Sequence, residues 1–301
     1  MLVPVVRALA EQFPDCEITM LSQQRMADLF ADLPSNVSFH GVDLRKQSVS
    51  EIVAGLGQYD RVADMHGVWR SLYIRWHMRL KGARVAHIRK GRWSKHQLVT
   101  GQIRQPLKHT IERYQDVLAA LGLPTKLQVN PTIVSTRARE GIGVAPFAAH
   151  QGKIYPIERM ERVVELLSER GEHVVLFGGG KQEQAVLDSW AAKYKGVESV
   201  AGKHSLGEEI ERMRSLRVML SMDSANMHLA SLVGTRVISI WGATHPYAGF
   251  LGYGQSMDDC IQRDLPCRPC SIYGNKPCRF GDYRCMDITP ETIIDKLCAR
   301  S

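Results

Sequence analysis

The segment VMLSMDSANMHLASLVGTRVISIWGATHPY, residues 218–247, carries the residue types and spacing best suited to chemistry. An apolar strand pattern ends at Asp223 and Ser224, and a helical pattern starts near Ala225. Asp and Ser favour helix N-caps, and a helix that follows a parallel strand presents N–H groups and a positive dipole end. His228 falls about one turn into that helix. The pattern predicts a phosphate site, although an ordinary capped helix with a surface His would look the same.

Three further loops follow apolar strand patterns in the second half of the chain. Lys153 precedes a helix start in APFAAHQGKIYP, the segment FGGGK places Gly178, Gly179, Gly180 and Lys181 after a strand, and GATHP begins at Gly242. A cation beside a helix start suits a diphosphate, and glycines let a ligand approach the backbone closely. FGGGK is neither G-x-G-x-x-G nor a P-loop, which argues against an NAD enzyme or an NTPase. Four such loops on one sheet edge predict a nucleotide-diphosphate site.

The positive charge is concentrated in one stretch. The chain has a net charge of +8, and the stretch between Asp64 and Glu112 contains 11 Lys and Arg and no acidic residue, so the remainder carries −3. Trp69, Trp76 and Trp93 are interleaved with these cations. An anionic sugar, an anionic membrane surface or a nucleic acid fits such a region. A solvated helix face is the alternative.

Strands and helices alternate along the whole chain, which predicts an α/β fold with doubly wound parallel sheets. The segment 128–140 loses this periodicity, so we place a domain boundary there and expect domains at 1–135 and 136–301, with a Cys-rich loop at 260–285. Ligands of open α/β sheets bind at the carboxyl ends of the strands. The four loops above therefore belong to one ligand site.

Length and composition fit two domains of an ordinary globular protein. The chain has 301 residues, of which 44% are hydrophobic and 23% charged. No apolar run reaches the length of a membrane span, and the N-terminal segment lacks the pattern of a signal peptide. We therefore expect a cytoplasmic protein, and the basic stretch fits peripheral contact with the cytoplasmic face of the inner membrane.

The segments APFAAHQGK, LFGGGK, SMDSANMHLASLVGT and SIWGATHPYAGFLGYG together resemble the heptosyltransferases of glycosyltransferase family nine. The resemblance extends over essentially the whole chain. It implies a GT-B architecture, in which two Rossmann-like domains face a cleft. It also implies inverting, metal-independent transfer of a heptose or related sugar from an ADP-sugar to a lipopolysaccharide core or similar anionic glycolipid, with no cofactor required for catalysis.

The resemblance also assigns the site residues. Asp223, Ser224 and Ala225 match the loop that holds the donor sugar and diphosphate, and His228 and Lys153 match donor-binding positions of the family. With the loops above, the expected donor-binding residues are Lys153, Gly178, Gly179, Gly180, Lys181, Asp223, Ser224, Ala225, His228, Gly242 and Thr244. On the acceptor side the expected residues are His66, Gly67, Arg70, Arg89, Lys90 and Arg92. The family's acidic residue after the glycine turn has no match, because Lys181 stands there.

The chain departs from the family at its N-terminus. Family members begin with a strand and a Gly-Asp turn before the helix that matches residues 3–13, and that Asp is the proposed catalytic base. We expect that the start is displaced and that this strand and turn are missing, although a fold that simply starts with a helix is the alternative. An inverting transfer needs a base, for which Asp64 and His66 are the candidates in this chain. A chain without the base would bind donor and not catalyse well.

Cys267, Cys270, Cys278 and Cys285 form C-x2-C-x7-C-x6-C in a loop-rich segment. This spacing is compatible with a structural zinc site. Buried free thiols, or a pair that oxidises, are the alternatives.

Two other functions compete with glycosyl transfer. A sugar-nucleotide-binding protein without the catalytic base would bind donor and transfer nothing. A nucleic-acid-binding protein would use the basic stretch and bind with steep salt dependence. That interpretation leaves the glycine and Asp-Ser loops without a purpose, so we expect no nucleic-acid partner.

Overall fold

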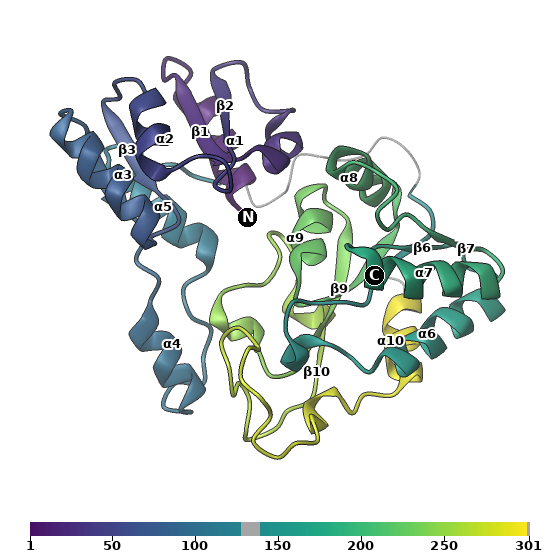
Figure 1. The fold of residues 1–301 in the computed structure, drawn as a ribbon. Coiled ribbons are helices and arrows are strands. Elements are labelled where there is room, and N and C mark those ends of the chain that lie inside the picture. Colours follow the sequence, from purple (N-terminus) through teal and green to yellow (C-terminus); the bar gives the residue numbers. More distant parts are fainter. Residues whose placement is uncertain (128–138, 300–301) are drawn as a thin grey trace. The chain divides into compact units, whose positions relative to one another are not determined.

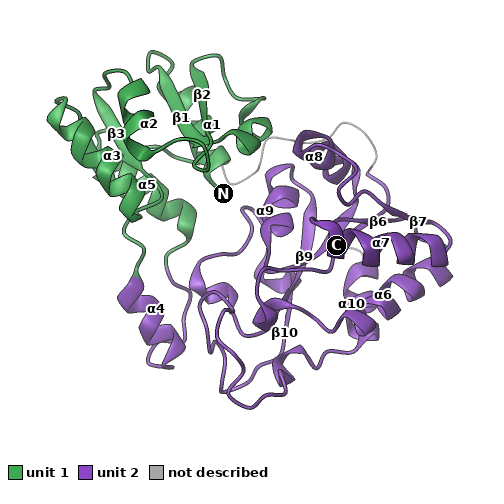
Figure 2. Ribbon diagram, viewed as in Figure 1, with its two compact units in different colours: residues 1–91, 108–129 green, residues 92–107, 130–301 purple. Residues whose placement is uncertain are grey.

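The computed structural model describes residues 1–127 and 139–299. The chain forms two compact units, one of residues 1–91 and 108–129 and the other of residues 92–107 and 130–301 (Figure 2). The predicted boundary at 135 and 136 lies outside the described residues. The sequence places residues 92–107 in the first half, whereas in the structure they pack on the second unit, where Leu107 N donates to Tyr247 O and Lys95 lies over the Phe250 ring.

A six-stranded parallel sheet organises the second unit (Figure 1). Its strands, in the spatial order β10-β9-β8-β5-β6-β7, are β10 (Cys260–Gln262), β9 (Arg236–Trp241), β8 (Val218–Met222), β5 (Ile142–Ala145), β6 (Val174–Leu176) and β7 (Val197–Ser199). β5, β6 and β8 are buried over their whole length. Continuous apolar strands are expected where helices cover both faces of a parallel sheet.

The helices of the second unit cover both faces of this sheet. They are α6 (Ile157–Glu169), α7 (Lys181–Lys193), α8 (Leu206–Ser215), α9 (Ala225–Leu232) and α10 (Pro290–Cys298). α4 (Arg92–Val99) also belongs to this unit, and its Lys95 lies over the Phe250 ring. Alternate strand residues such as Val218, Leu220 and Ile238 form the main core with side chains of α6, α7 and α10. α9 packs on β8, β9 and α8. Short 3-10 helices complete the unit: η2 (Gln151–Lys153), η3 (Pro246–Ala248), η4 (Met257–Asp259) and η5 (Arg284–Met286).

The first unit contains four described strands in two separate parallel pairs. β1 (Ile18–Gln23) pairs with β2 (Val37–Val42), and β3 (Arg61–Asp64) pairs with β4 (Arg84–His87). Its helices are α1 (Leu2–Gln12), η1 (Gln24–Phe30), α2 (Val49–Gly55), α3 (Trp69–Leu80) and α5 (Thr110–Ala120). Ser48 and Glu51 form a capping box that fixes the start of α2. The expectation of a further strand ahead of α1 stays a prediction.

Among the described residues, we find no helix that combines the length and the apolar character needed to span a bilayer.

Candidate functional site

The four loops singled out from the sequence follow four neighbouring strands, β9, β8, β5 and β6. The chain runs from β5 outward through β6 to β7, and then from β8 outward in the opposite direction through β9 to β10. β5 and β8 are therefore the strands between which the winding direction reverses. Such a switch point leaves room for a ligand at the carboxyl ends of the strands. The sequence order of the loops does not reveal this adjacency.

Lys153 and Asp223 meet at this switch point. Lys153 lies at the end of the loop after β5, and Asp223 follows β8 directly. Lys153 Nζ is 2.8 Å from Asp223 Oδ2, and the two side chains are 15% and 4% exposed. The ion pair places one cation and one carboxylate at the point where the fold favours ligand binding.

The loops after β5 and β9 are tied to each other. Ala243 N donates to Gly152 O over 2.8 Å. A Cβ atom on Gly242 would lie 2.7 Å from Gly152 O and would collide with the Met286 methyl group. A Cβ atom on Gly152 would lie 2.9 Å from the Ala243 Cβ atom. Only glycine at 152 and 242 allows this approach of backbone to backbone.

Arg268 holds the loop after β9, and nothing in the sequence pattern singled it out. Its side chain is buried and donates from Nε to Gly242 O and from one terminal nitrogen to Thr244 O, over 2.9 Å for the latter. Further bonds reach Arg263 O and the Gln262 side chain. Because Arg268 donates to the carbonyl oxygens of both Gly242 and Thr244, it fixes the backbone of residues 242–244. Its position between two Cys of the C-x2-C motif is the only signal that the sequence offers.

The Cys-rich segment supports the site from behind. Cys270 N and Ser271 N both donate to Ala243 O. A Cβ atom on Gly274, whose φ is +72°, would lie 2.6 Å from Lys153 Cγ. The segment therefore packs directly against the Lys153 side chain.

The four cysteines of the C-x2-C-x7-C-x6-C pattern are free thiols, and Cys285 is buried while the other three are half-buried. Within the described ranges 1–127 and 139–299, no three His, Cys, Asp or Glu side chains are arranged to hold a metal ion. The geometry therefore lends no support to zinc at Cys267, Cys270, Cys278 and Cys285, and the zinc site stays a prediction.

The glycine turn after β6 is exposed at Gly179 and Gly180, and Lys181 opens α7 with an exposed side chain. Gly179 N donates to Glu183 Oε2 over 2.8 Å. Glu183 lies in the first turn of α7 and was not among the expected site residues. Glu183 supplies an acidic group at the glycine turn. It lies two residues after Lys181, the position at which the family resemblance expects an acidic residue.

The start of α9 differs from the expected cap. Ser224 is the N-cap residue, but its side chain makes no cap hydrogen bond, and Ser224 Oγ lies 3.2 Å from Ser221 Oγ instead. Ala225 is exposed and His228 is half-buried. The first-turn N–H groups of α9 are therefore not capped by Ser224. Thr244, expected at the same site, is fully buried, and its contribution is the carbonyl that accepts from Arg268.

His245 follows Thr244 and is held as a neutral acceptor. Burial, and next the nearby Arg268 charge, lower its pKa from 6.5 to about 4. His245 Nδ1 accepts from Tyr247 N over 3.1 Å, and the two rings are 4.3 Å apart. The neutral imidazole ring of His245 therefore caps the start of η3, at the end of the loop after β9.

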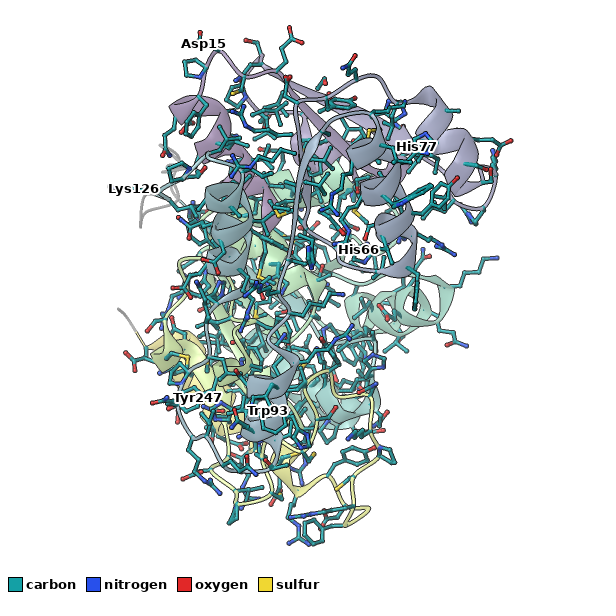
Figure 3. The ribbon with its side chains drawn as sticks, turned by 90° about the vertical axis from the view of Figure 1, so that its left-hand side faces the viewer. Asp15, His66, His77, Trp93, Lys126 and Tyr247 are labelled. Atoms are coloured by element: carbon teal, nitrogen blue, oxygen red, sulfur yellow. The ribbon has the colours of Figure 1, made fainter. Side chains whose placement is uncertain are left out.

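Asp64, at the end of β3 in the first unit, is engaged by three donors. Its Oδ1 accepts from His66 N over 2.9 Å and from Gly67 N over 2.8 Å, and its Oδ2 lies 3.0 Å from Arg75 Nε. Gly67 has a φ of +60°, which suits glycine. The carboxylate thus shapes the turn before α3. The His66 side chain is exposed at this turn (Figure 3).

The expected acceptor-side cations lie in both units. Arg70 is exposed on α3, and Arg89 and Lys90 follow β4 in the first unit. Arg92 opens α4, which belongs to the second unit and also carries the exposed Trp93 (Figure 3). The structure therefore does not gather these cations on one unit.

A cavity of about 830 Å³ in the second unit lies at the opposite, amino ends of the strands. Its arginines are already engaged: Arg217 with Glu172, Arg236 with Asp259, and Arg139 with the carbonyls of Val233 and Gly234. This cavity does not include any of the four loops.

Comparison with known proteins gives a consistent result. The model of the family described as "Glycosyltransferase family 9 (heptosyltransferase)" matches residues 54–282. Lipopolysaccharide heptosyltransferase 3 of Escherichia coli is 25% identical over 273 residues, which cover 80% of this chain and 79% of the relative.

Solved structures share the fold over nearly the whole chain. The glycosyl transferase family 9 protein of Veillonella parvula has a TM-score of 0.71 at 18% identity, covering 98% of this chain and 91% of that one. E. coli heptosyltransferase WaaC with ADP-2-deoxy-2-fluoro heptose has a TM-score of 0.67 at 18% identity, covering 98% and 95%. The predicted α/β, GT-B fold class is confirmed.

Proposed function

Because the chain belongs to glycosyltransferase family 9, we propose that this glycosyltransferase moves a heptose from ADP-heptose to the core sugars of a lipopolysaccharide-type acceptor. The curated relative is a lipopolysaccharide heptosyltransferase, and one of the similar solved structures is a heptosyltransferase with a fluorinated ADP-heptose. Both facts concern those proteins and support the proposal for this one.

The observation that carries the proposal is the Lys153–Asp223 pair between β5 and β8. In the proposed complex the donor diphosphate competes for the Lys153 ammonium group, since phosphate oxygens form charge-assisted hydrogen bonds with it. The Asp223 carboxylate then accepts a hydrogen bond from a hydroxyl group of the donor sugar. In this proposal Glu183, beside the glycine turn, accepts hydrogen bonds from ribose hydroxyls, as acidic residues do in other nucleotide-binding α/β folds.

In the proposed reaction, an acceptor hydroxyl oxygen attacks the anomeric carbon. The bond from this carbon to the β-phosphate oxygen breaks, ADP leaves with the electron pair, and a base takes the hydroxyl proton. Lys153 and the N-terminal amides of α7 and α9 stabilise the charge that develops on ADP. We therefore expect transfer without an added metal ion.

Of the two candidate bases in the described chain, His66 fits better than Asp64. Asp64 already accepts from two backbone amides and pairs with Arg75, so its role is to position the turn. His66 is exposed at the same turn. In this proposal Arg70, Arg89 and Lys90 of the first unit, with Gly67 at the turn, face the anionic acceptor, together with Arg92.

The Asp64 carboxylate already bonds to two backbone amides and Arg75, so it is not free to act as a base. This favours a second candidate function, which is donor binding without transfer. A protein of this kind would bind ADP-heptose through the Lys153 loop and release no ADP when acceptor is added.

The experiment is a transfer assay with ADP-heptose and a lipopolysaccharide core that lacks its heptose. We expect acceptor-dependent release of ADP that EDTA does not reduce, and a heptose mass added to the acceptor. Donor binding without release of ADP would favour the second function. Failure to bind any nucleotide sugar would contradict both.

A further inference from the structure

Helix α3 exposes a continuous apolar stripe. Trp69, Trp76 and Leu80 are 86%, 57% and 66% exposed. Leu72 and Tyr73, the other two members, are also exposed. Residues at spacings of three and four lie on one face of an α-helix. These five side chains therefore cover an arc of roughly 100° along the full length of α3.

The opposite face of α3 packs on its own unit. Met78 is 1% exposed and forms a small core with Leu56 and Ala83, and Ile74 packs against that core. Met78 is the one buried residue of α3, whereas α6, which is similar in length, buries four. A surface helix normally turns its large apolar side chains inward. In α3 the largest of them point outward.

Cations flank the stripe on both sides. Measured round the helix from Trp69, Arg70 lies roughly 100° to one side and Arg79 about 80° to the other. Both are exposed, whereas Lys81, the C-cap residue, donates from Nζ to Leu56 O. α3 contains no acidic residue, and His77 lies near its C-terminal end (Figure 3). Large aromatic side chains with an exposed cation on either side present an apolar and a positively charged surface together.

This combination matches an anionic bilayer surface. Tryptophan and tyrosine favour the headgroup region of membranes. Interfacial helices combine apolar residues on one face with Lys and Arg beside them. A second copy of the chain is a poor occupant, because it would bring the same cations face to face. Single-stranded nucleic acid is also a poor occupant, because Leu72 and Leu80 offer no ring for base stacking.

We propose that α3 binds anionic phospholipid bilayers, with Trp69, Leu72, Tyr73, Trp76 and Leu80 in the headgroup region and Arg70 and Arg79 against lipid phosphates. The proposal depends on this surface alone and not on sugar transfer. The vesicles in the following experiments contain neither donor nor acceptor, so failure of the proposed function leaves their outcome unchanged.

The first test is sedimentation of the full chain with vesicles. We expect binding to vesicles of equal phosphatidylcholine and phosphatidylglycerol, and much weaker binding to pure phosphatidylcholine. Trp69→Ser/Trp76→Ser/Leu80→Ser should reduce binding roughly tenfold or more. The three side chains are exposed, so circular dichroism and the melting temperature should stay those of the unsubstituted protein. Trp93→Ser is the matched control, because Trp93 is 71% exposed on α4.

The second test uses the indole fluorescence of α3. The chain has five Trp, and Trp190 and Trp241 are buried. In a Trp93→Phe background the exposed indoles are therefore Trp69 and Trp76. We expect their emission to shift to shorter wavelength with anionic vesicles and to be quenched by brominated phosphatidylglycerol.

Three outcomes would overturn the proposal. One is unchanged vesicle binding by the triple variant. Another is an equal loss of binding in Trp93→Ser. The last is binding to vesicles with phosphatidylglycerol that is no stronger than binding to pure phosphatidylcholine.

Discussion

Lys153 Nζ lies 2.8 Å from Asp223 Oδ2 although the two residues are 70 positions apart in the sequence. The pair joins the loops of β5 and β8, the two strands between which the winding of the sheet reverses. Asp223 is almost fully buried, so its carboxylate depends on Lys153 for charge compensation. The same ammonium group is the one that we propose for the donor diphosphate.

Removing one partner of this pair should destabilise the protein strongly. Lys153→Met leaves a buried carboxylate unpaired, which should lower the free energy of unfolding by about 3–5 kcal/mol. Lys153→Met/Asp223→Asn should recover part of that loss. Urea unfolding of both variants and of Asp223→Asn completes the cycle. The control is Lys193→Met, because Lys193 pairs with Glu161 at an exposed position and its loss should change stability far less than Lys153→Met does. Equal effects at the two lysines would contradict the account.

Arg268 should be needed to shape the loop after β9. Arg268→Met leaves the carbonyls of Gly242 and Thr244 without their charged donor, which should lower stability by about 2 kcal/mol or more and raise the KM for donor. Arg263→Met is the control, because Arg263 is less buried and pairs with Asp287 at the surface. Differential scanning fluorimetry and donor titration measure both effects. Arg268→Met with an unchanged KM would show that the Arg268 hydrogen bonds are not required for donor binding.

Two glycines at the same sheet edge should respond differently to alanine. Gly242→Ala places a methyl group 2.7 Å from Gly152 O, and we expect a loss of about 1–3 kcal/mol. Gly179→Ala meets no atom within 4 Å and should change stability by less than about 0.5 kcal/mol. Urea midpoints of the two variants test this contrast. A larger loss for Gly179→Ala than for Gly242→Ala would be inconsistent with the packing of these loops.

His245 should make stability depend on pH below neutrality. Its pKa is about 4 in the folded protein and about 6.5 when unfolded, so the folded state favours the neutral ring. The contribution of His245 to the free energy of unfolding is complete above pH 6.5. It is lost as the pH falls from 6.5 to 4, because the unfolded chain takes up the proton first. His245→Asn should flatten the melting temperature over that range relative to the unsubstituted chain. Parallel pH profiles of the two proteins would refute the assignment.

The sequence predicts the second unit well because its strands are short apolar runs that end in recognisable loops. VMLSM and RVISIW, β8 and β9, are buried strands, and Asp223 follows the first of them as predicted. The adjacency of β5 and β8 was not predictable, because strand order depends on crossovers that leave no local trace. The Lys153–Asp223 pair follows from that order.

The features that could not be predicted from the sequence depend on tertiary packing. Arg268 lies in a Cys-rich loop whose pattern drew attention to its thiols, while the guanidinium group makes the hydrogen bonds to the loop after β9. Ser224 is the N-cap of α9 as predicted, but its hydroxyl lies 3.2 Å from the Ser221 hydroxyl of β8 and makes no cap hydrogen bond. Residues 92–107 leave the first unit to pack on the second, and no composition change marks this excursion.

The most direct test of the central claim is calorimetric titration of ADP-heptose into the unsubstituted protein, Lys153→Met and Lys193→Met. We predict that Lys153→Met weakens binding about 10- to 100-fold, as loss of a charge-assisted phosphate contact should, and that Lys193→Met binds like the unsubstituted protein. Equal affinity in all three proteins would contradict a donor diphosphate site at the β5–β8 switch point.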